Sequence, residues 1–243
     1  MAFPTLKIEL FADGANLQTM ISRYREGFIK GFTTNPTLMA KAGITDYQGF
    51  AQSVLAEIKN LPISFEVFSD DFNEMESQAE LIGSWGENVN IKIPITNTKG
   101  ESAIPLVQRL LAKGLKLNVT AILTRQQWLD LRSILKPKDD VIVSIFAGRI
   151  ADTGVDPVPM MRQAVQDFSD LPHAKVLWAS PRETLNIFQA EECGCDIITA
   201  TDDLIAKLAM HGKDLGQFSL ETVKMFYNDA TKAGFTLPSI AKV

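Results

Sequence analysis

The stretch VNIKIPIT, residues 89–96, places a lysine in the middle of an apolar run. Successive side chains of a β-strand point to opposite faces, so the apolar residues at odd positions share one face and Lys92 lies on the other. Lysine is almost never fully buried without a partner or a task. Taken alone, the stretch is most simply interpreted as a half-exposed strand with Lys92 in water, and the other strands must decide where that amine lies.

Short apolar runs alternate with amphipathic stretches eight times along the chain. Strict alternation is typical of parallel strands joined by right-handed crossovers, and eight units predict a closed (β/α)8 TIM barrel, with an open doubly wound sheet as the alternative. The predicted strands are 6–13, 28–34, 63–68, 89–95, 115–119, 141–146, 174–180 and 195–200. The predicted helices include 16–25, 46–60, 70–85 and 100–113, and an additional C-terminal helix at 220–233 follows the eighth unit.

The size of the chain is that of one barrel. It has 243 residues, and barrels of about 250 residues fold as one domain. No linker rich in Pro, Gly or Ser divides it. We therefore predict a single domain over residues 1–243, with 219–243 as C-terminal helix and tail.

The composition restricts the partners and the location. The net charge is −5 and the basic residues are spread along the chain, which argues against a nucleic-acid or membrane partner. The first ten residues, MAFPTLKIEL, lack the basic and apolar segments of a signal peptide, and no apolar run approaches the length of a membrane span. A cytoplasmic protein is predicted.

The cysteines and histidines do not form recognisable metal sites. Cys193 and Cys195 are separated by one residue, which favours reduced, buried thiols over a disulfide framework. His173 and His211 are the only histidines, and neither has another ligand at H-x-H or H-x-x-x-H spacing. The sequence therefore predicts chemistry without a metal.

The alternation seen in residues 89–96 recurs in the other predicted strands. In a barrel, one face of each strand packs against helices and the other points inward, where active-site residues lie at the C-terminal end. Several inner faces carry polar side chains near that end, so Lys92 is predicted to be an interior lysine. These polar residues are Asp13, Glu66, Lys92, Asn118, Thr120 and Ser144.

An interior lysine can act as a nucleophile. Burial disfavours the charged form of an amine, and a neutral amine attacks a carbonyl carbon to form a Schiff base. Loss and return of water at the carbinolamine stage require an acid/base nearby. Glu66 and Thr120 are suited to hold that water, and Asp13 is suited to take a proton from a substrate hydroxyl.

Each of these residues also has a purely structural interpretation. Glu66 could keep Lys92 charged in an ion pair. Asp13, which precedes Gly14, could be a turn residue or a helix cap. Asn118 and Thr120 could satisfy backbone groups of loops. Their common position near strand ends favours the catalytic interpretation.

The motifs taken together resemble those of the transaldolases, in particular the short-chain branch that also contains the fructose-6-phosphate aldolases. The resemblance covers nearly the whole chain, and the TTNP motif together with the lysine strand is specific. The matching motifs are LFADG, GFTTNPTLM, FEVF, NIKIP, LNVTAILT, VSIFAGRIADTG and WASPRE.

The resemblance implies roles for the residues in these motifs. Lys92 would be the Schiff-base nucleophile, Asp13 the general acid/base of carbon–carbon cleavage, and Glu66 and Thr120 the residues that position the catalytic water. The substrate-binding residues would be Thr34, Asn35, Asn118, Ser144 and Phe146 around the dihydroxyacetone unit, and Arg149, Ser180 and Arg182 at the phosphate. Paired charged hydrogen bonds from guanidinium groups suit phosphate, and barrels often bind phosphate near strands seven and eight.

Two positions distinguish the branches of this family. The aldolases resemble this chain less at Glu66, where they carry Gln, and at Phe146, where they carry Tyr. A phenolic hydroxyl could assist protonation and release of the three-carbon intermediate, whereas Phe leaves it for an acceptor aldehyde. The chain also departs from the family pattern, with Gly14 where Thr is usual and Pro181 between Ser180 and Arg182.

The resemblance implies transfer of a dihydroxyacetone unit between sugar phosphates, without metal or organic cofactor. Sedoheptulose 7-phosphate or fructose 6-phosphate would be the donor, and glyceraldehyde 3-phosphate or erythrose 4-phosphate the acceptor. The alternatives are an aldolase that releases dihydroxyacetone, a transaldolase with an unusual donor, and a barrel that only binds sugar phosphates. Relatives form pentamers or decamers through the C-terminal helix, and helix 220–233 could pack on a neighbour or on its own barrel.

Overall fold

The computed structural model describes residues 4–237, which contain a closed barrel of eight parallel strands. Strand β8 pairs with β1 in parallel and closes the ring. The prediction of a (β/α)8 barrel is confirmed, and the open sheet is wrong. The strands are β1 Glu9–Asp13, β2 Gly31–Thr33, β3 Ile63–Glu66, β4 Val89–Pro94, β5 Leu117–Ile122, β6 Val141–Ile145, β7 Ala174–Trp178 and β8 Ile197–Thr201.

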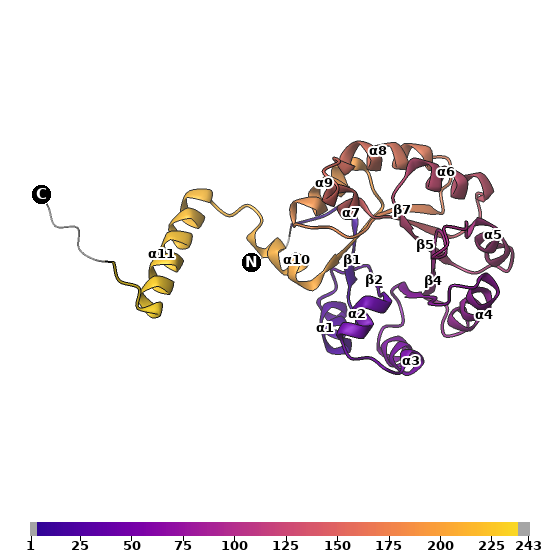
Figure 1. Cartoon of the computed structure of the whole chain (residues 1–243), viewed down its shortest axis with the longest axis horizontal. Coiled ribbons are helices and arrows are strands. Elements are labelled where there is room, and N and C mark those ends of the chain that lie inside the picture. The colour runs from indigo at the N-terminus through magenta and orange to yellow at the C-terminus, as the bar shows by residue number, and fades with distance from the viewer. Residues whose placement is uncertain (1–3, 238–243) are drawn as a thin grey trace, which may run out of the picture. The chain divides into compact units, whose positions relative to one another are not determined.

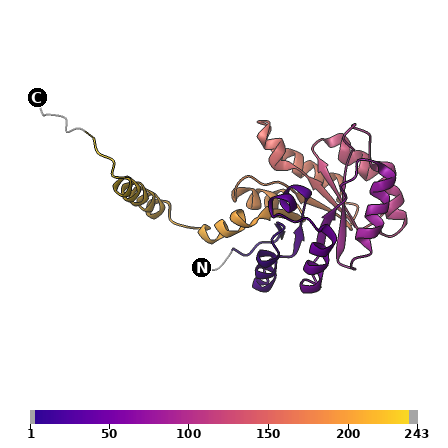
Figure 2. The ribbon, with the colours of Figure 1, turned by 60° about the horizontal axis from the view of Figure 1, so that its bottom comes forward.

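Helices surround the ring of strands (Figures 1 and 2). In the barrel they are α1 Leu17–Glu26, α2 Pro36–Lys41, α3 Tyr47–Glu57, α4 Phe72–Gly83, α5 Ile104–Ala112, α6 Arg125–Ile134, α7 Ala147–Asp152, α8 Pro157–Asp167, α9 Leu185–Cys193 and α10 Asp202–Lys207. The short helices α2, α7 and α10 were not predicted, because six residues are too few to establish a helical period. Asp46 and Thr124 cap α3 and α6, as their side-chain oxygens accept backbone N–H groups of the first turn.

The chain divides into two compact units, Thr5–Ala206 and a C-terminal unit that starts at Lys207. The second unit contains a short 3-10 helix, Leu208–Met210, and α11, Leu215–Ala233. Helix α11 begins five residues before the predicted start, because the Asp214 side chain accepts the Gln217 N–H and caps it there. Whether the two units form the single domain predicted from the sequence depends on how they associate, and this stays a prediction. The predicted tail beyond residue 237 lies outside the described residues.

Apolar side chains fill the space between strands and helices and also form a layer inside the barrel. The inner layer consists of Phe11, Ile142, Leu177, Ala179 and Ile197, with Phe146 packed against it. Gly31 makes room for the Phe11 ring, since a Cβ at Gly31 would lie 2.5 Å from ring carbons of Phe11. One cavity lies toward each end of the barrel interior, on either side of this layer.

Among residues 4–237, no helix is long and apolar enough to cross a membrane. In the same range no group of three or more His, Cys, Asp or Glu side chains could hold a metal ion. Both cysteines are buried free thiols, Cys193 at the end of α9 and Cys195 just before β8.

Candidate active site

A cavity of about 540 Å³ lies at the C-terminal ends of the strands. It is the place where active sites of (β/α)8 barrels are found. Ten of the twelve residues singled out from the sequence line it. They are Asp13, Asn35, Glu66, Lys92, Thr120, Ser144, Phe146, Arg149, Ser180 and Arg182.

Lys92 is buried in this cavity, with 6% of its surface exposed. Its Nζ donates a hydrogen bond to the Thr34 carbonyl at 3.0 Å and lies 3.2 Å from Glu66 Oε2. The half-exposed interpretation of this strand is therefore wrong. The amine is held by a carbonyl and a carboxylate, which leaves it one further donor direction toward the cavity.

Glu66 reaches Lys92 because the two residues are partners in the register of β3 and β4. The backbone at Glu66 is held by Tyr47, whose hydroxyl donates to the Glu66 carbonyl at 2.7 Å and accepts the Glu66 N–H at 2.8 Å. Nothing in the sequence around Tyr47 had indicated this role. A side chain on α3 thus positions the carboxylate beside the lysine.

Thr120 lies on β5, next to the lysine strand. The register pairs Thr120 with Pro94 and the preceding inward residue, Asn118, with Lys92. Its hydroxyl is buried, faces the cavity and has no hydrogen-bond partner among the described residues. A buried hydroxyl without a protein partner is a place for a water molecule or a substrate group. The structural alternative, in which Thr120 hydrogen-bonds to backbone groups of a loop, is therefore wrong.

Asp13 ends β1 and enters the cavity from the opposite side of the ring. Thr33 Oγ1 donates to Asp13 Oδ1 at 2.7 Å, and the Thr33 hydroxyl in turn lies 2.5 Å from that of Thr199. Burial raises the pKa of Asp13, while the charge of Lys92 and the Thr33 hydrogen bond lower it in part. Asn16, rather than Asp13, caps α1. The helix-cap interpretation of Asp13 is wrong.

Two predicted residues, Thr34 and Asn118, do not line the cavity. Asn118 is fully buried, donates to Ser64 Oγ at 3.0 Å and accepts from Ser144 Oγ at 2.6 Å. The Thr34 hydroxyl donates to the Ser64 carbonyl at 2.9 Å. Both side chains therefore support the residues above them, and Thr34 meets Lys92 only through its backbone.

Asn35 lines the cavity and at the same time begins α2. Its side-chain oxygen accepts the Leu38 N–H at 2.9 Å, and Pro36 occupies the first turn. Proline at this position has no N–H to lose and a φ suited to a helix. Asn35 is thereby fixed in one orientation, and its NH₂ group has no partner among the described residues.

The loop after β7 brings Ser180 and Arg182 to the cavity in a strained conformation. Ser180 has a φ of 60°, and Ala121, which lines the same cavity from β5, has a φ of 61°. These are the only described residues other than glycine with positive φ, and such strain is concentrated at functional sites. Gly148 permits the conformation, since a Cβ there would lie 1.6 Å from the Ser180 carbonyl oxygen.

Arg182 is held by Asp152 at the rim of the cavity. Its Nε donates to Asp152 Oδ1 at 2.8 Å, and its Nη1 donates to Ser180 Oγ at 2.9 Å. These contacts lower the pKa of Asp152. The guanidinium of Arg149 lies 5.6 Å from the centre of the Phe146 ring. The pairing of Arg182 with Asp152 was not anticipated, because Asp152 ends α7 and Arg182 lies 30 residues later, in the loop after β7.

Eight further residues line the cavity, and four of them are polar side chains that the sequence reasoning missed: Thr33, Thr37, Lys41 and Thr199. Thr33 and Thr199 lie on inward positions of β2 and β8, so the alternation of those strands could have identified them. Lys41 ends α2, and no pattern in the sequence marks it. With it, the lining contains four basic side chains, Lys41, Lys92, Arg149 and Arg182, and two carboxylates, Asp13 and Glu66. The cavity has the excess of positive charge that an anionic substrate requires.

Residues 10–242 match the family model described as Transaldolase/Fructose-6-phosphate aldolase. The chain belongs to the transaldolase/fructose-6-phosphate aldolase family. This confirms the resemblance of its motifs to those of the transaldolases.

Relatives named as probable transaldolases match over most of their length. One from Maridesulfovibrio salexigens is 33% identical over 224 residues, which cover 90% of this chain and 99% of the relative. One from Bdellovibrio bacteriovorus is 30% identical over 227 residues, which cover 93% and 99%. The family enzymes are thus of the same short length as this chain.

Among solved structures, 2,3-dimethylmalate lyase, a member of the PEP mutase/isocitrate lyase superfamily, superposes with a TM-score of 0.55. It is 13% identical, and the match covers 98% of this chain and 86% of the lyase. At this identity the similarity supports the barrel fold of the family and carries no information on its chemistry.

Proposed function

We propose that this protein is a transaldolase, which transfers a dihydroxyacetone unit from a ketose phosphate to an aldose phosphate through a Schiff base on Lys92. One observation carries the proposal. The Lys92 amine is buried in a cavity at the C-terminal end of the barrel, 3.2 Å from the Glu66 carboxylate. Membership of the family supports the same reaction class.

The first half of the reaction binds and cleaves the donor. Lys92 Nζ attacks the ketose carbonyl carbon, and the carbinolamine loses its oxygen as water to form an iminium ion. Asp13 takes the proton of the C4 hydroxyl, the C3–C4 bond breaks, and its electron pair moves into the iminium to form an enamine. The shortened aldose leaves. The raised pKa of Asp13 suits a group that must take up and return this proton.

The second half reverses these steps on the acceptor. The enamine carbon attacks the aldehyde carbon of the acceptor, and Asp13 returns its proton to the new hydroxyl. A water molecule then adds to the iminium, and the carbinolamine breaks down to product and free Lys92. We place this water between Glu66 and the unpartnered hydroxyl of Thr120.

The site also supports a proposal for how the substrate is held. Ser144, resting on Asn118, and the NH₂ group of Asn35 would bind the hydroxyls of the dihydroxyacetone unit. Arg149, Ser180 and Arg182 would hold the phosphate, for which Arg182 would exchange part of its contact with Asp152. Such exchange replaces one charged hydrogen bond by another.

Phe146 favours transfer over free cleavage. Its ring lines the cavity and packs on the apolar layer beneath. It offers no hydroxyl for protonating the enamine, so the intermediate would persist until an acceptor arrives. The competing function, an aldolase that releases dihydroxyacetone, would need another proton donor at this place.

Borohydride reduction in the presence of fructose 6-phosphate tests the Schiff base. Mass mapping should find the reduced three-carbon or six-carbon adduct on Lys92. The Lys92→Gln variant should give no adduct, while Lys113→Gln, a surface change on the outside of the barrel, should give the same adduct as the unchanged protein. An unmodified Lys92, or an adduct on another lysine, contradicts the proposal.

Turnover with and without an acceptor distinguishes the two enzymes. We expect fructose 6-phosphate with erythrose 4-phosphate, or sedoheptulose 7-phosphate with glyceraldehyde 3-phosphate, to react rapidly. Fructose 6-phosphate alone should release dihydroxyacetone slowly. Equal rates with and without acceptor would favour the aldolase.

We also propose a cytoplasmic homo-oligomer, a pentamer or decamer, in which α11 contacts a neighbouring copy. The apolar residues Leu220, Val223, Phe226 and Tyr227 of α11 follow a helical spacing that supports such packing. Light scattering coupled to gel filtration should give the mass of the oligomer, and the mass of a single chain would contradict it.

A further inference from the structure

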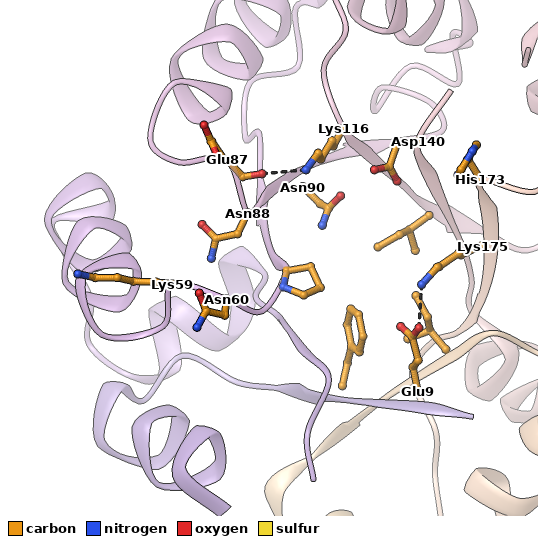
Figure 3. A pocket seen from close by; sticks show the side chains of 14 residues that line it. Glu9, Lys59, Asn60, Glu87, Asn88, Asn90, Lys116, Asp140, His173 and Lys175 are labelled. Atoms are coloured by element: carbon orange, nitrogen blue, oxygen red, sulfur yellow. Dashed lines mark hydrogen bonds and ion pairs between the residues drawn. The ribbon is translucent and has the colours of Figure 1, made fainter. Parts of the chain in front are cut away.

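A second cavity, of about 480 Å³, lies at the N-terminal ends of the strands (Figure 3). Its lining residues open or precede strands, for example Glu9 in β1, Asn90 in β4 and Asp140 before β6. No described residue lines both this lower cavity and the active-site cavity. The proposed reaction therefore leaves it without a task.

The lower cavity is built by the same inward faces as the active site. Asn90 precedes Lys92 by two residues on β4, and Ile142 precedes Ser144 by two on β6. Phe11, Ile142 and Ile197 belong to the apolar layer inside the barrel and also line the lower cavity. This layer forms an apolar floor that separates the two ends.

Asn90 is the observation that indicates a ligand. It is 5% exposed, and Figure 3 shows its amide directed into the cavity. Its side chain makes no hydrogen bond to any described residue. Asn88 beside it differs, because its Nδ2 donates to the carbonyls of Ile58 and Leu61, each at 2.9 Å. The Asn90 side chain is buried as a whole, and its amide is open to the cavity, where a water or a ligand can satisfy it.

The charges around the lower cavity cancel, unlike those around the active site. The lining contains equal numbers of lysines and carboxylates, namely Lys59, Lys116 and Lys175 and Glu9, Glu87 and Asp140.

Two of these lysines already contact other residues through their ammonium groups, and the third points away from the cavity. Lys175 Nζ lies 2.8 Å from Glu9 Oε1, and Lys116 Nζ donates to the Glu87 carbonyl at 2.9 Å. The ammonium of Lys59 points away from the cavity (Figure 3). The lining thus carries no net charge from its lysines and carboxylates, and its ammonium groups either have a partner or point away, so it suits an uncharged ligand.

We propose that the lower cavity binds a small uncharged polyol or unphosphorylated sugar. Each hydroxyl both donates and accepts, and the Asn90 amide offers one group of each kind. Asp140 would accept a further hydroxyl at the rim, and the C–H face of the ligand would rest on the Phe11 ring and Pro62. The volume is within the range of about 300–1,000 Å³ that small-molecule sites occupy.

Titration of the ¹⁵N-labelled full-length protein with sorbitol tests this proposal by NMR. Sorbitol has no carbonyl and forms no Schiff base, so the result is independent of the proposed transaldolase reaction. We expect saturable shifts at residues 88–90, 116 and 140. Inorganic phosphate and glycine, as charged probes, should leave these signals unshifted.

Variants locate the site. Asn90→Leu, which keeps the side-chain size but removes both polar groups, should weaken sorbitol binding by about tenfold. Asp140→Ala should weaken sorbitol binding by a smaller factor. Because Asp140 is exposed at the rim, we expect this variant to fold normally. Ser144→Ala, the matched loss of a polar group in the active-site cavity, should leave sorbitol affinity unchanged.

Three results would overturn the proposal. The first is the absence of any saturable shift, which would mean that water alone occupies the cavity. The second is tighter binding of phosphate or glycine than of sorbitol at these residues. The third is sorbitol affinity that responds to Ser144→Ala and not to Asn90→Leu or Asp140→Ala.

Discussion

The two ends of the barrel enclose cavities of similar volume, about 540 Å³ above the inner apolar layer and about 480 Å³ below it. The upper lining has twice as many basic as acidic side chains, and the lower lining has equal numbers. The positive-φ residues Ala121 and Ser180 both lie in the upper cavity. The barrel therefore has a cavity at each end, and the two differ in side-chain charge and backbone strain, which is why we propose phosphate binding at the upper one.

The largest expected effect is that of losing the amine in the upper cavity. Lys92→Gln should reduce kcat by a factor on the order of 10⁴ or more, since the variant lacks the amine that forms the proposed Schiff base. Lys59→Gln, the same change at the lower end where the ammonium points away from the cavity, should leave kcat unchanged. Steady-state assays with donor and acceptor measure both, and equal losses would remove the functional distinction between the ends.

The charge excess of the upper cavity predicts the next effect. Arg182→Gln should raise KM for a phosphorylated donor by about 10- to 100-fold, because charge-assisted hydrogen bonds to phosphate are lost. Turnover of unphosphorylated fructose should change little. The control is Arg109→Gln, a surface arginine paired with Glu76. An equal loss for both donors would show that Arg182 does not recognise phosphate.

Phe146→Tyr should alter the partition of the intermediate. A phenolic hydroxyl beside the enamine should raise acceptor-independent cleavage several-fold, in keeping with proton transfer by a positioned side chain. Phe146→Leu is the matched control without a hydroxyl. Dihydroxyacetone release measured against transfer gives the ratio, and an unchanged ratio in the Tyr variant would contradict the role assigned to Phe146.

The smallest effect is one of stability. The pKa of Asp13 is raised by burial, so its contribution to stability is full below the ordinary pKa of 3.8 and is lost as pH rises through the folded-state value. Asp13→Asn should therefore gain stability relative to the unchanged protein between acid and neutral pH, as measured by urea unfolding. Asp152→Asn should show the opposite trend, because Arg182 lowers the pKa of Asp152. Parallel pH curves for both variants would contradict this assignment.

The amino-acid sequence allowed most of the residues around the upper cavity's lysine to be predicted. Lys92, Glu66 and Thr120 could be placed in one cavity because each lies on the inward face near the end of its strand. Thr34 and Asn118 were also expected at the substrate, yet neither lines the cavity. Thr33 faces the cavity instead of Thr34, and Asn118 lies two residues before Thr120 on the inward face of β5. The rule of alternation states which face a residue occupies but not its depth along the barrel.

Other contacts had no local signal at all. The hydrogen bonds of Tyr47 with Glu66 and of Arg182 with Asp152 join residues 19 and 30 positions apart, which belong to different elements of the barrel. The end of α2 that carries Lys41 to the cavity is equally unmarked. Such contacts depend on where the helices and loops between successive strands lie around the barrel, and their different lengths do not reveal this.

The periodic pattern alone established eight alternating units, their inward faces and the interior position of Lys92, because side-chain alternation depends only on neighbours along the chain. Ring closure determined the rest: which inward residues meet, the apolar layer that divides the interior, and the different charge of its two ends. Those properties arise from side chains contributed by distant strands, and no segment contains them by itself.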